Sequence, residues 1–120
     1  MQRTVENTLE DNVRASKYDI ISQQPIGTEA ELSDGVIARR LKNDEDGNML
    51  FKICMEKGGL IGSNYHDFAE DMVLYKGKIL EVVSNTVISD NRVLRLKCNQ
   101  LHSLYALEDS VIYAQLNKPK

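Results

Sequence analysis

The feature that most limits the fold of this chain is a two-residue hydrophobic period that recurs in many short runs. In the run 93–98, Leu94 and Leu96 alternate with basic residues, so apolar and charged side chains would lie on opposite faces of an extended strand. Turn-forming pairs such as Asp34-Gly35 separate the runs. Short strands at this spacing, with no helical pattern between them, predict an all-β antiparallel sandwich or barrel. The other runs of this kind are 19–23, 36–41, 49–56, 72–75, 79–83, 104–107 and 111–116.

Length and charge narrow the classes of protein that this chain can belong to. Its 120 residues suffice for one domain, and its net charge of −3 comes without any run rich in lysine or arginine. We therefore expect neither nucleic acid nor an anionic membrane as a partner. The apolar stretches are too short to span a bilayer, and the residues after Met1 lack the apolar core of a signal peptide. These features predict a cytoplasmic protein.

The two cysteines, Cys54 and Cys98, each fall inside a predicted strand. Two cysteines do not make a disulfide framework. We expect both to be reduced and buried, since free cysteine is among the most often buried residue types. A catalytic pair of Cys98 with His102 is the alternative, which we disfavour because strand alternation puts both on one face without bringing them into contact.

The first 17 residues differ from the rest of the chain. Val5, Leu9 and Val13 recur there at helical spacing in a polar background. This pattern predicts either a short amphipathic helix or a loose arm that packs on a partner subunit. The domain prediction is therefore an arm or helix over 1–17 and one β domain over 18–120.

One segment carries a recognisable spacing of glycine, histidine and glutamate. Gly58 is followed after seven residues by His66, then by Glu70 and Gly77. This segment resembles the first cupin motif, in which a glycine and five residues precede His-x-His, and a glutamate and a second glycine follow. Asn64 stands where that motif has its first histidine.

The second cupin motif is matched mainly by His102. Aligning on this histidine puts Asn91 and Asn99 at two glycine positions, while Lys97 and Ala106 replace a proline and an asparagine. Asparagine is one of the few residues that tolerate a left-handed backbone, so it can replace a turn glycine. The resemblance covers roughly residues 36–116 and implies a small single-domain cupin, an antiparallel double-stranded β-helix or jelly-roll barrel.

The same resemblance implies one polar pocket inside the barrel. Residues two apart on a strand share a face, so Asn64 and His66 would point the same way. In a cupin, Glu70 and His102 point into the same space. The site prediction is therefore a constellation of Asn64, His66, Glu70 and His102. The residues predicted to line it are Met72, Leu74, Gln100 and Leu104.

Cupins commonly hold a metal ion with three histidines and a glutamate. Two histidines and a carboxylate can still form a facial triad, whereas Asn64 would bind such an ion less well than an imidazole. The cofactor prediction is therefore either a divalent ion, manganese, iron or zinc, or no metal at all, with the histidines hydrogen bonding a ligand directly.

Two functions follow from this pocket, and the sequence does not choose between them. One is a cupin that binds a small molecule, with or without a divalent metal. The alternative is a metal-dependent enzyme of the dioxygenase, isomerase or decarboxylase type. No residue is assigned a catalytic role. Because small cupins are often dimers, we also expect a homodimer, with Val5, Leu9 and Val13 as contacts.

Overall fold

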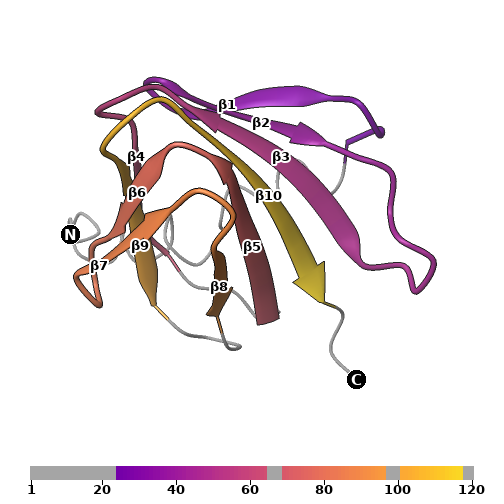
Figure 1. Cartoon of the computed structure of the whole chain (residues 1–120). Helices are drawn as coiled ribbons and strands as arrows, with labels where there is room; N and C mark the ends of the chain where they lie inside the picture. Colours follow the sequence, from indigo (N-terminus) through magenta and orange to yellow (C-terminus); the bar gives the residue numbers. More distant parts are fainter. Residues whose placement is uncertain (1–23, 65–68, 97–100, 118–120) are drawn as a thin grey trace, which may run out of the picture.

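The structure is a computed structural model that describes residues 24–64, 69–96 and 101–117. Ten strands and no helix lie within these ranges (Figure 1). The segment 1–17, the predicted strand at 19–23, and Cys98 lie outside them. The strands are β1 (Glu29–Ser33), β2 (Val36–Arg40), β3 (Met49–Met55), β4 (Leu60–Asn64), β5 (Ala69–Lys76), β6 (Lys78–Glu81), β7 (Thr86–Ser89), β8 (Val93–Leu96), β9 (His102–Ala106) and β10 (Ser110–Asn117).

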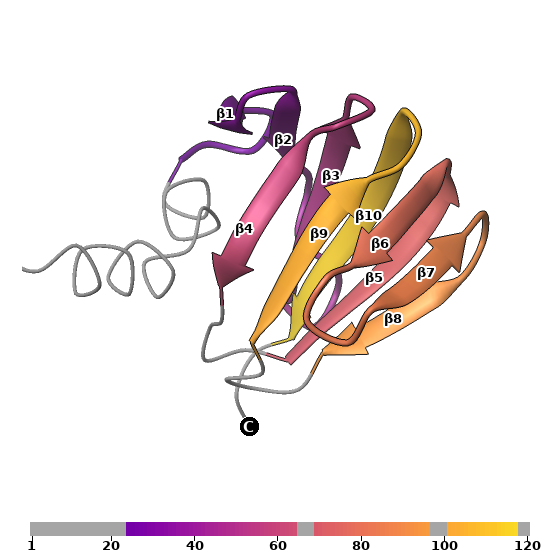
Figure 2. The ribbon, with the colours of Figure 1, turned by 90° about the vertical axis from the view of Figure 1, so that its left-hand side faces the viewer.

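The strands form two antiparallel sheets that face each other. A six-stranded sheet has the order β1-β2-β3-β10-β5-β8, and a four-stranded sheet has the order β4-β9-β6-β7 (Figures 1 and 2). Every pair of neighbouring strands is antiparallel. Strands that are distant in sequence, such as β3 and β10, are neighbours, as in a jelly roll. The predicted all-β antiparallel barrel is confirmed.

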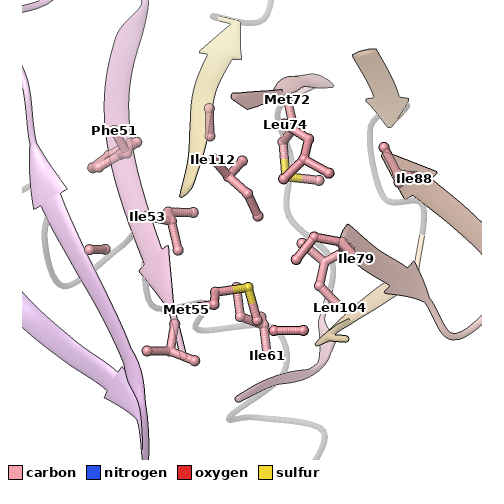
Figure 3. Close-up of a cluster of buried hydrophobic side chains, with 14 of the residues drawn as sticks. Phe51, Ile53, Met55, Ile61, Met72, Leu74, Ile79, Ile88, Leu104 and Ile112 are labelled. Atoms are coloured by element: carbon pink, nitrogen blue, oxygen red, sulfur yellow. The ribbon is translucent and has the colours of Figure 1, made fainter. Parts of the chain in front are cut away.

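The hydrophobic core fills the space between the sheets (Figure 3). It follows the alternation in the sequence: on β3, Phe51, Ile53 and Met55 are buried, while Cys54 between them is exposed. Burying a large apolar side chain stabilises a fold by about 1.5–3 kcal/mol, so these inward rows stabilise the contact between the sheets. The rest of the core is Val36, Ala38, Ile61, Met72, Leu74, Ile79, Ile88, Leu104, Ala106, Ile112, Ala114 and Leu116.

The prediction that Cys54 is a buried packing residue is wrong. Its thiol is free and exposed, because the alternation of β3 turns Phe51 and Ile53 inward and leaves Cys54 on the outer face of the six-stranded sheet. The position of Cys54 in the strand, and not the general tendency of cysteine to be buried, determines its exposure.

Three strands were absent from the predicted set, namely β1, β4 and β7. Each lies at the edge of its sheet, but the remaining edge strand, β8, was predicted from its clear alternation, so edge position alone does not explain the omission. β1 and β4 contain few apolar residues in alternation, and β7 is only four residues long. A fourth difference is the end of β6, which was predicted to continue to residue 83. It stops at Glu81, whose carboxylate accepts hydrogen bonds from the backbone of Val83 and Ser84 and so forms a turn.

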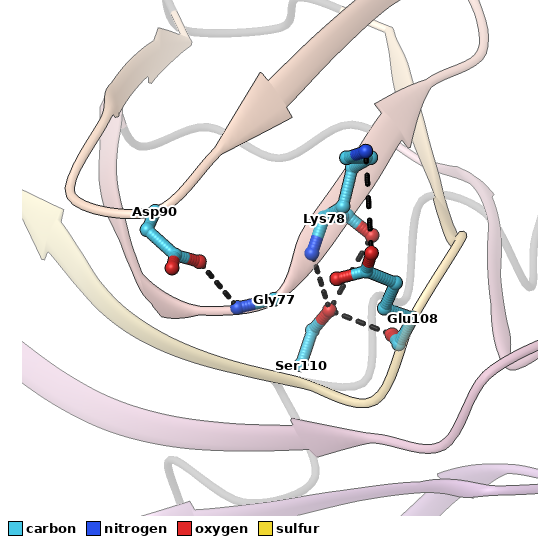
Figure 4. A network of polar contacts seen from close by, with 5 residues as sticks. All are labelled: Gly77, Lys78, Asp90, Glu108 and Ser110. Atoms are coloured by element: carbon cyan, nitrogen blue, oxygen red, sulfur yellow. Dashed lines mark hydrogen bonds and ion pairs between the residues drawn. The ribbon is translucent and has the colours of Figure 1, made fainter.

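Tight turns connect the strands at the end of the barrel where β5 ends, around Gly77 (Figure 4). Gly77 has a φ of 109°, and a side chain there would collide with the Ser110 hydroxyl, so the second glycine of the motif is required by geometry. Its N–H donates to Asp90 at 2.6 Å. Asn91 has a φ of 63°, which confirms the expected left-handed backbone at that asparagine.

Candidate functional site

Glu70 and His102 meet inside the barrel, from opposite sheets. Glu70 is the second residue of β5 in the six-stranded sheet, and His102 is the first residue of β9 in the four-stranded sheet. Both side chains point inward. Glu70 lies on the same buried face of β5 as Met72, and His102 lies on the same buried face of β9 as Leu104. The period of each strand therefore directs both polar groups into the same interior.

The two side chains are in contact and almost inaccessible to solvent. His102 Nε2 lies 3.6 Å from Glu70 Oε1, with 3% and 0% of the two side chains exposed. The neighbours of Glu70 across the sheet are Leu116 on β10 and Leu96 on β8. The pair is thus buried, and desolvation of a charge in a buried position costs several kcal/mol.

The separation of the pair suits two ligands of a single metal ion. Protein ligands bind zinc at about 2.0–2.2 Å, which puts two of them roughly 3.4 Å apart at a tetrahedral angle. The observed 3.6 Å between His102 Nε2 and Glu70 Oε1 differs from this by only a few tenths of an ångström. An imidazole nitrogen and a carboxylate oxygen are also donors that zinc, iron and manganese accept.

The other predicted site residues are placed only in part. The backbone of Asn64 pairs with His102 in the β4–β9 ladder, so β4 ends beside the histidine. His66 and Gln100 lie outside the described residues, and so the predicted four-residue constellation stays a prediction. Within 24–64, 69–96 and 101–117, no group of three or more histidine, cysteine or acidic side chains is arranged to hold a metal ion.

The three described residues predicted to line the pocket belong to the core. Met72, Leu74 and Leu104 are each 2–3% exposed, and the space that they line with Ile79 and Ile112 amounts to only about 10 Å³. That is about the lower limit for one water molecule. The barrel is therefore filled around these three residues, which leaves no room for a ligand between them.

Glu70 and His102 lie at one end of the barrel. At this end β4 ends at Asn64, β8 ends at Leu96 and β5 begins at Ala69 (Figure 2). The tight turns around Gly77 lie at the other end of β5 (Figure 4). The pair is thus at the end where Asn64 lies, while the opposite end is held by short turns.

A second buried carboxylate, Glu81, was not singled out in the sequence. It is 3% exposed and accepts hydrogen bonds from the backbone N–H groups of Ser103, Ser84 and Val83 at 2.8, 2.7 and 3.3 Å. Burial by itself raises the pKa of this carboxyl, but the bonds from Ser103, Ser84 and Val83 outweigh it and hold the pKa below its usual value. The signal in the sequence was its position two residues after Ile79, on the inward row of β6.

No known protein-family model matches the chain. A search of curated proteins found no significant match either. No helix in the described part of the chain is long and apolar enough to cross a membrane.

Solved structures, by contrast, share the fold. The chain is similar to an RmlC-like cupin from Shewanella frigidimarina, with a TM-score of 0.67 and 14% identity over 78% of this chain and 86% of that one. KdgF from Halomonas sp. matches with a TM-score of 0.64 and 13% identity, over 78% of this chain and 88% of its own.

A third similar structure belongs to a regulator. The Cupin_2 domain of an XRE family transcriptional regulator from Enterobacter cloacae matches with a TM-score of 0.61 and 15% identity, over 72% of this chain and 99% of that domain. The cupin resemblance predicted from Gly58, His66, Glu70 and Gly77 is therefore confirmed for the fold: the chain has the RmlC-like cupin fold.

Proposed function

We propose that this protein binds a small molecule at the end of its barrel where Glu70 meets His102, and that these two side chains hold a divalent metal ion which anchors the ligand. The observation that carries the proposal is the contact of two fully buried ionisable groups from opposite sheets, 3.6 Å apart. In this proposal His66, predicted from the first motif, supplies a further ligand.

The energetic cost of the pair supports a role in binding. Replacing a buried ion pair by apolar residues of similar volume is often neutral or stabilising by about 1–4 kcal/mol. Leu116, the neighbour of Glu70 on β10, is a buried core residue, so an apolar residue would suit packing at this position. A carboxylate retained against an imidazole is thus better explained by a ligand than by stability, and such groups cluster at functional sites.

The donor set indicates what the site would bind. When bound, a divalent ion would supply a positive centre that attracts a carboxylate, hydroxyl or carbonyl oxygen of a metabolite. Glu70 and His102 would hold the ion, and the filled core around Leu74 and Leu104 would limit the ligand to the end of the barrel. The regulator domain among the similar structures supports binding without catalysis.

The first test measures metal binding by the purified protein, prepared without chelator or histidine tag. We expect about one manganese, iron or zinc per chain by elemental analysis. Glu70→Gln should weaken metal affinity by at least about 100-fold, since even partners outside the coordination shell change it 10–100-fold. Glu81→Gln is the matched control: it alters the other buried glutamate and should leave the affinity unchanged.

Each outcome decides between parts of the proposal. If both glutamine variants bind metal as the wild type does, Glu70 is not a ligand. If the wild type takes up no metal, a panel of metabolites is tested by thermal shift on the wild type and on Glu70→Gln. A ligand that stabilises only the wild type would keep Glu70 and His102 as a metal-free site, and the absence of any such ligand would overturn the proposal.

A further inference from the structure

The outer face of the four-stranded sheet carries a row of apolar side chains that crosses all four strands. The strand registers place its members side by side: Leu60 on β4 pairs with Tyr105 on β9, Tyr105 with Leu80 on β6, and Leu80 with Val87 on β7. Leu60, Tyr105 and Val87 are 45%, 37% and 54% exposed, and Leu80 is half-buried. A solvent-facing sheet face is normally polar, and contiguous exposed apolar surface marks an interaction site.

The residues that border this apolar row add little polarity to it. Val82, just after β6, is itself 45% exposed. The hydroxyl of Ser103 donates to the carbonyl oxygen of Ile61 at 3.0 Å. Lys78 is the charged residue at the other border, where its ammonium group lies 4.0 Å from the carboxylate of Glu108. No element of the described part of the chain lies over this face, which is turned toward the viewer in Figure 2.

The described chain begins close to this sheet. The carbonyl oxygen of Gln24 accepts a hydrogen bond from the guanidinium group of Arg40 at 2.7 Å, and the chain then enters β1. This strand borders β4, since Ser33 Oγ donates to the carbonyl oxygen of Leu60 at 2.6 Å. The N-terminal segment, residues 1–17, is therefore attached through the strand that borders β4, on which the apolar row starts.

We propose that the N-terminal segment docks on this outer face within the same chain, with Val5, Leu9 and Val13 against the apolar row. At helical spacing these three side chains share one face, whereas Asp11 and Arg14 fall on the other. A helix with its side chains is about 10–12 Å across, and a row over four strands about 4.8 Å apart spans roughly 14 Å. One helix would therefore cover most of the row.

The length of the chain permits this docking. Ten residues, 14–23, separate Val13 from Gln24, and they reach up to about 33 Å when extended. That exceeds both the roughly 14 Å width of the row and the roughly 26 Å length of an eight-residue strand. Helices shorter than about 12–15 residues are marginal by themselves in water, so the apolar row also provides the packing that a short helix needs.

The other exposed apolar surface suits this segment less well. It lies on the outer face of the six-stranded sheet, where Val93 pairs with Val73 and Val73 with Tyr113. The registers place Lys52 on β3 and Arg39 on β2 between these residues and β1. The segment would have to cross charged side chains to reach that surface, whereas the row on the four-stranded sheet starts on β4 itself.

The first experiment measures amide hydrogen exchange of the full chain by mass spectrometry. In the wild type, residues 5–13 should exchange at least about tenfold more slowly than the same sequence in a free peptide. Tyr105→Ser should remove this protection. Tyr113→Ser is the matched control, since Tyr113 is equally exposed, at 38% against 37%, on a central strand of the other sheet. An unprotected wild type, or an effect of Tyr113→Ser as large as that of Tyr105→Ser, overturns the proposal.

The second experiment separates docking within one chain from docking on a second copy. In a Cys54→Ser, Cys98→Ser background, Asn12→Cys on the segment is combined with Ser89→Cys, beside the row on β7. A short bis-maleimide should link the two thiols within one chain, and Asn12→Cys combined with Val93→Cys, on the other sheet, should not link. In a mixture of isotopically labelled and unlabelled chains, links between the two kinds of chain would assign the segment to a second copy. That result, or no link at all, contradicts the proposal.

A third measurement tests the contact by additivity. Leu9→Ser should lower the melting temperature of the wild type by roughly 3 °C and should have little further effect on Tyr105→Ser, because residues in contact are not additive. In the Tyr113→Ser background its full effect should remain. Full additivity with Tyr105→Ser would show that Leu9 does not pack on this row.

Discussion

Glu70 and Glu81 are both buried glutamates, at 0% and 3% exposure, yet they contact different kinds of partner. The carboxylate of Glu81 accepts hydrogen bonds from three backbone N–H groups, two in the turn that ends β6 and one from Ser103 on β9. The carboxylate of Glu70 contacts the imidazole of His102, a side chain on the opposite sheet. Glu81 thus accepts hydrogen bonds from backbone N–H groups, whereas Glu70 contacts a second ionisable side chain in the interior of the barrel.

This difference shows that two carboxylates buried to the same degree can have different kinds of partner. Backbone N–H groups need an acceptor wherever they are buried, so Glu81 has a structural reason to be there. Glu70, by contrast, contacts the imidazole of His102, an ionisable side chain on the opposite sheet. The partner of a buried charge is thus more informative than its degree of burial, and three measurements can test this comparison.

The largest effect is expected from removing the structural glutamate. Glu81→Ala should lower the free energy of unfolding by about 3 kcal/mol, because each buried donor left without an acceptor costs about 1–3 kcal/mol. The melting temperature should fall by on the order of 10 °C, measured by calorimetry. An unchanged melting temperature would mean that the three hydrogen bonds of Glu81 contribute little and that the two glutamates are alike.

A smaller effect is expected at the other glutamate. Replacing the pair with apolar residues, Glu70→Met together with His102→Leu, should leave the free energy of unfolding within about 1 kcal/mol of the wild type or raise it, while metal and ligand binding are lost. Urea denaturation measures the stability. Glu81→Met is the matched control and should destabilise. A clear loss of stability in the double variant would assign the pair a structural role.

The smallest effect is a dependence of stability on pH. The pKa of Glu81 is lower in the folded chain than its ordinary value of 4.5, so its contribution is complete above about pH 4.5 and is lost as the pH falls through the folded pKa. The slope from one group is at most about 1.4 kcal/mol per pH unit. Urea denaturation from pH 3 to 6 should give a shallower slope for Glu81→Gln than for the wild type. Identical slopes would contradict this assignment.

Much of the fold could be predicted from the sequence because central strands and required glycines leave local signals. The alternation of β3 and β10 identified their inward faces, and the glycine at Gly77 marked a turn that excludes a side chain. The strands β1 and β7 were missed because β1 has few apolar residues and β7 is only four residues long, whereas β8, also at an edge, was predicted from its alternation. The site could be predicted only as far as Glu70 and His102, which the structure brings into contact.

The sequence by itself predicted the class of fold and singled out Glu70 and His102, because hydrophobic period and motif spacing are properties of the linear chain. Only the tertiary structure decided that Glu70 contacts His102, that Glu81 holds a turn, and that Cys54 lies on the outer face of the six-stranded sheet. These facts depend on which strands become neighbours and in which register. Registers arise from packing between residues far apart in the chain, and no local pattern encodes them.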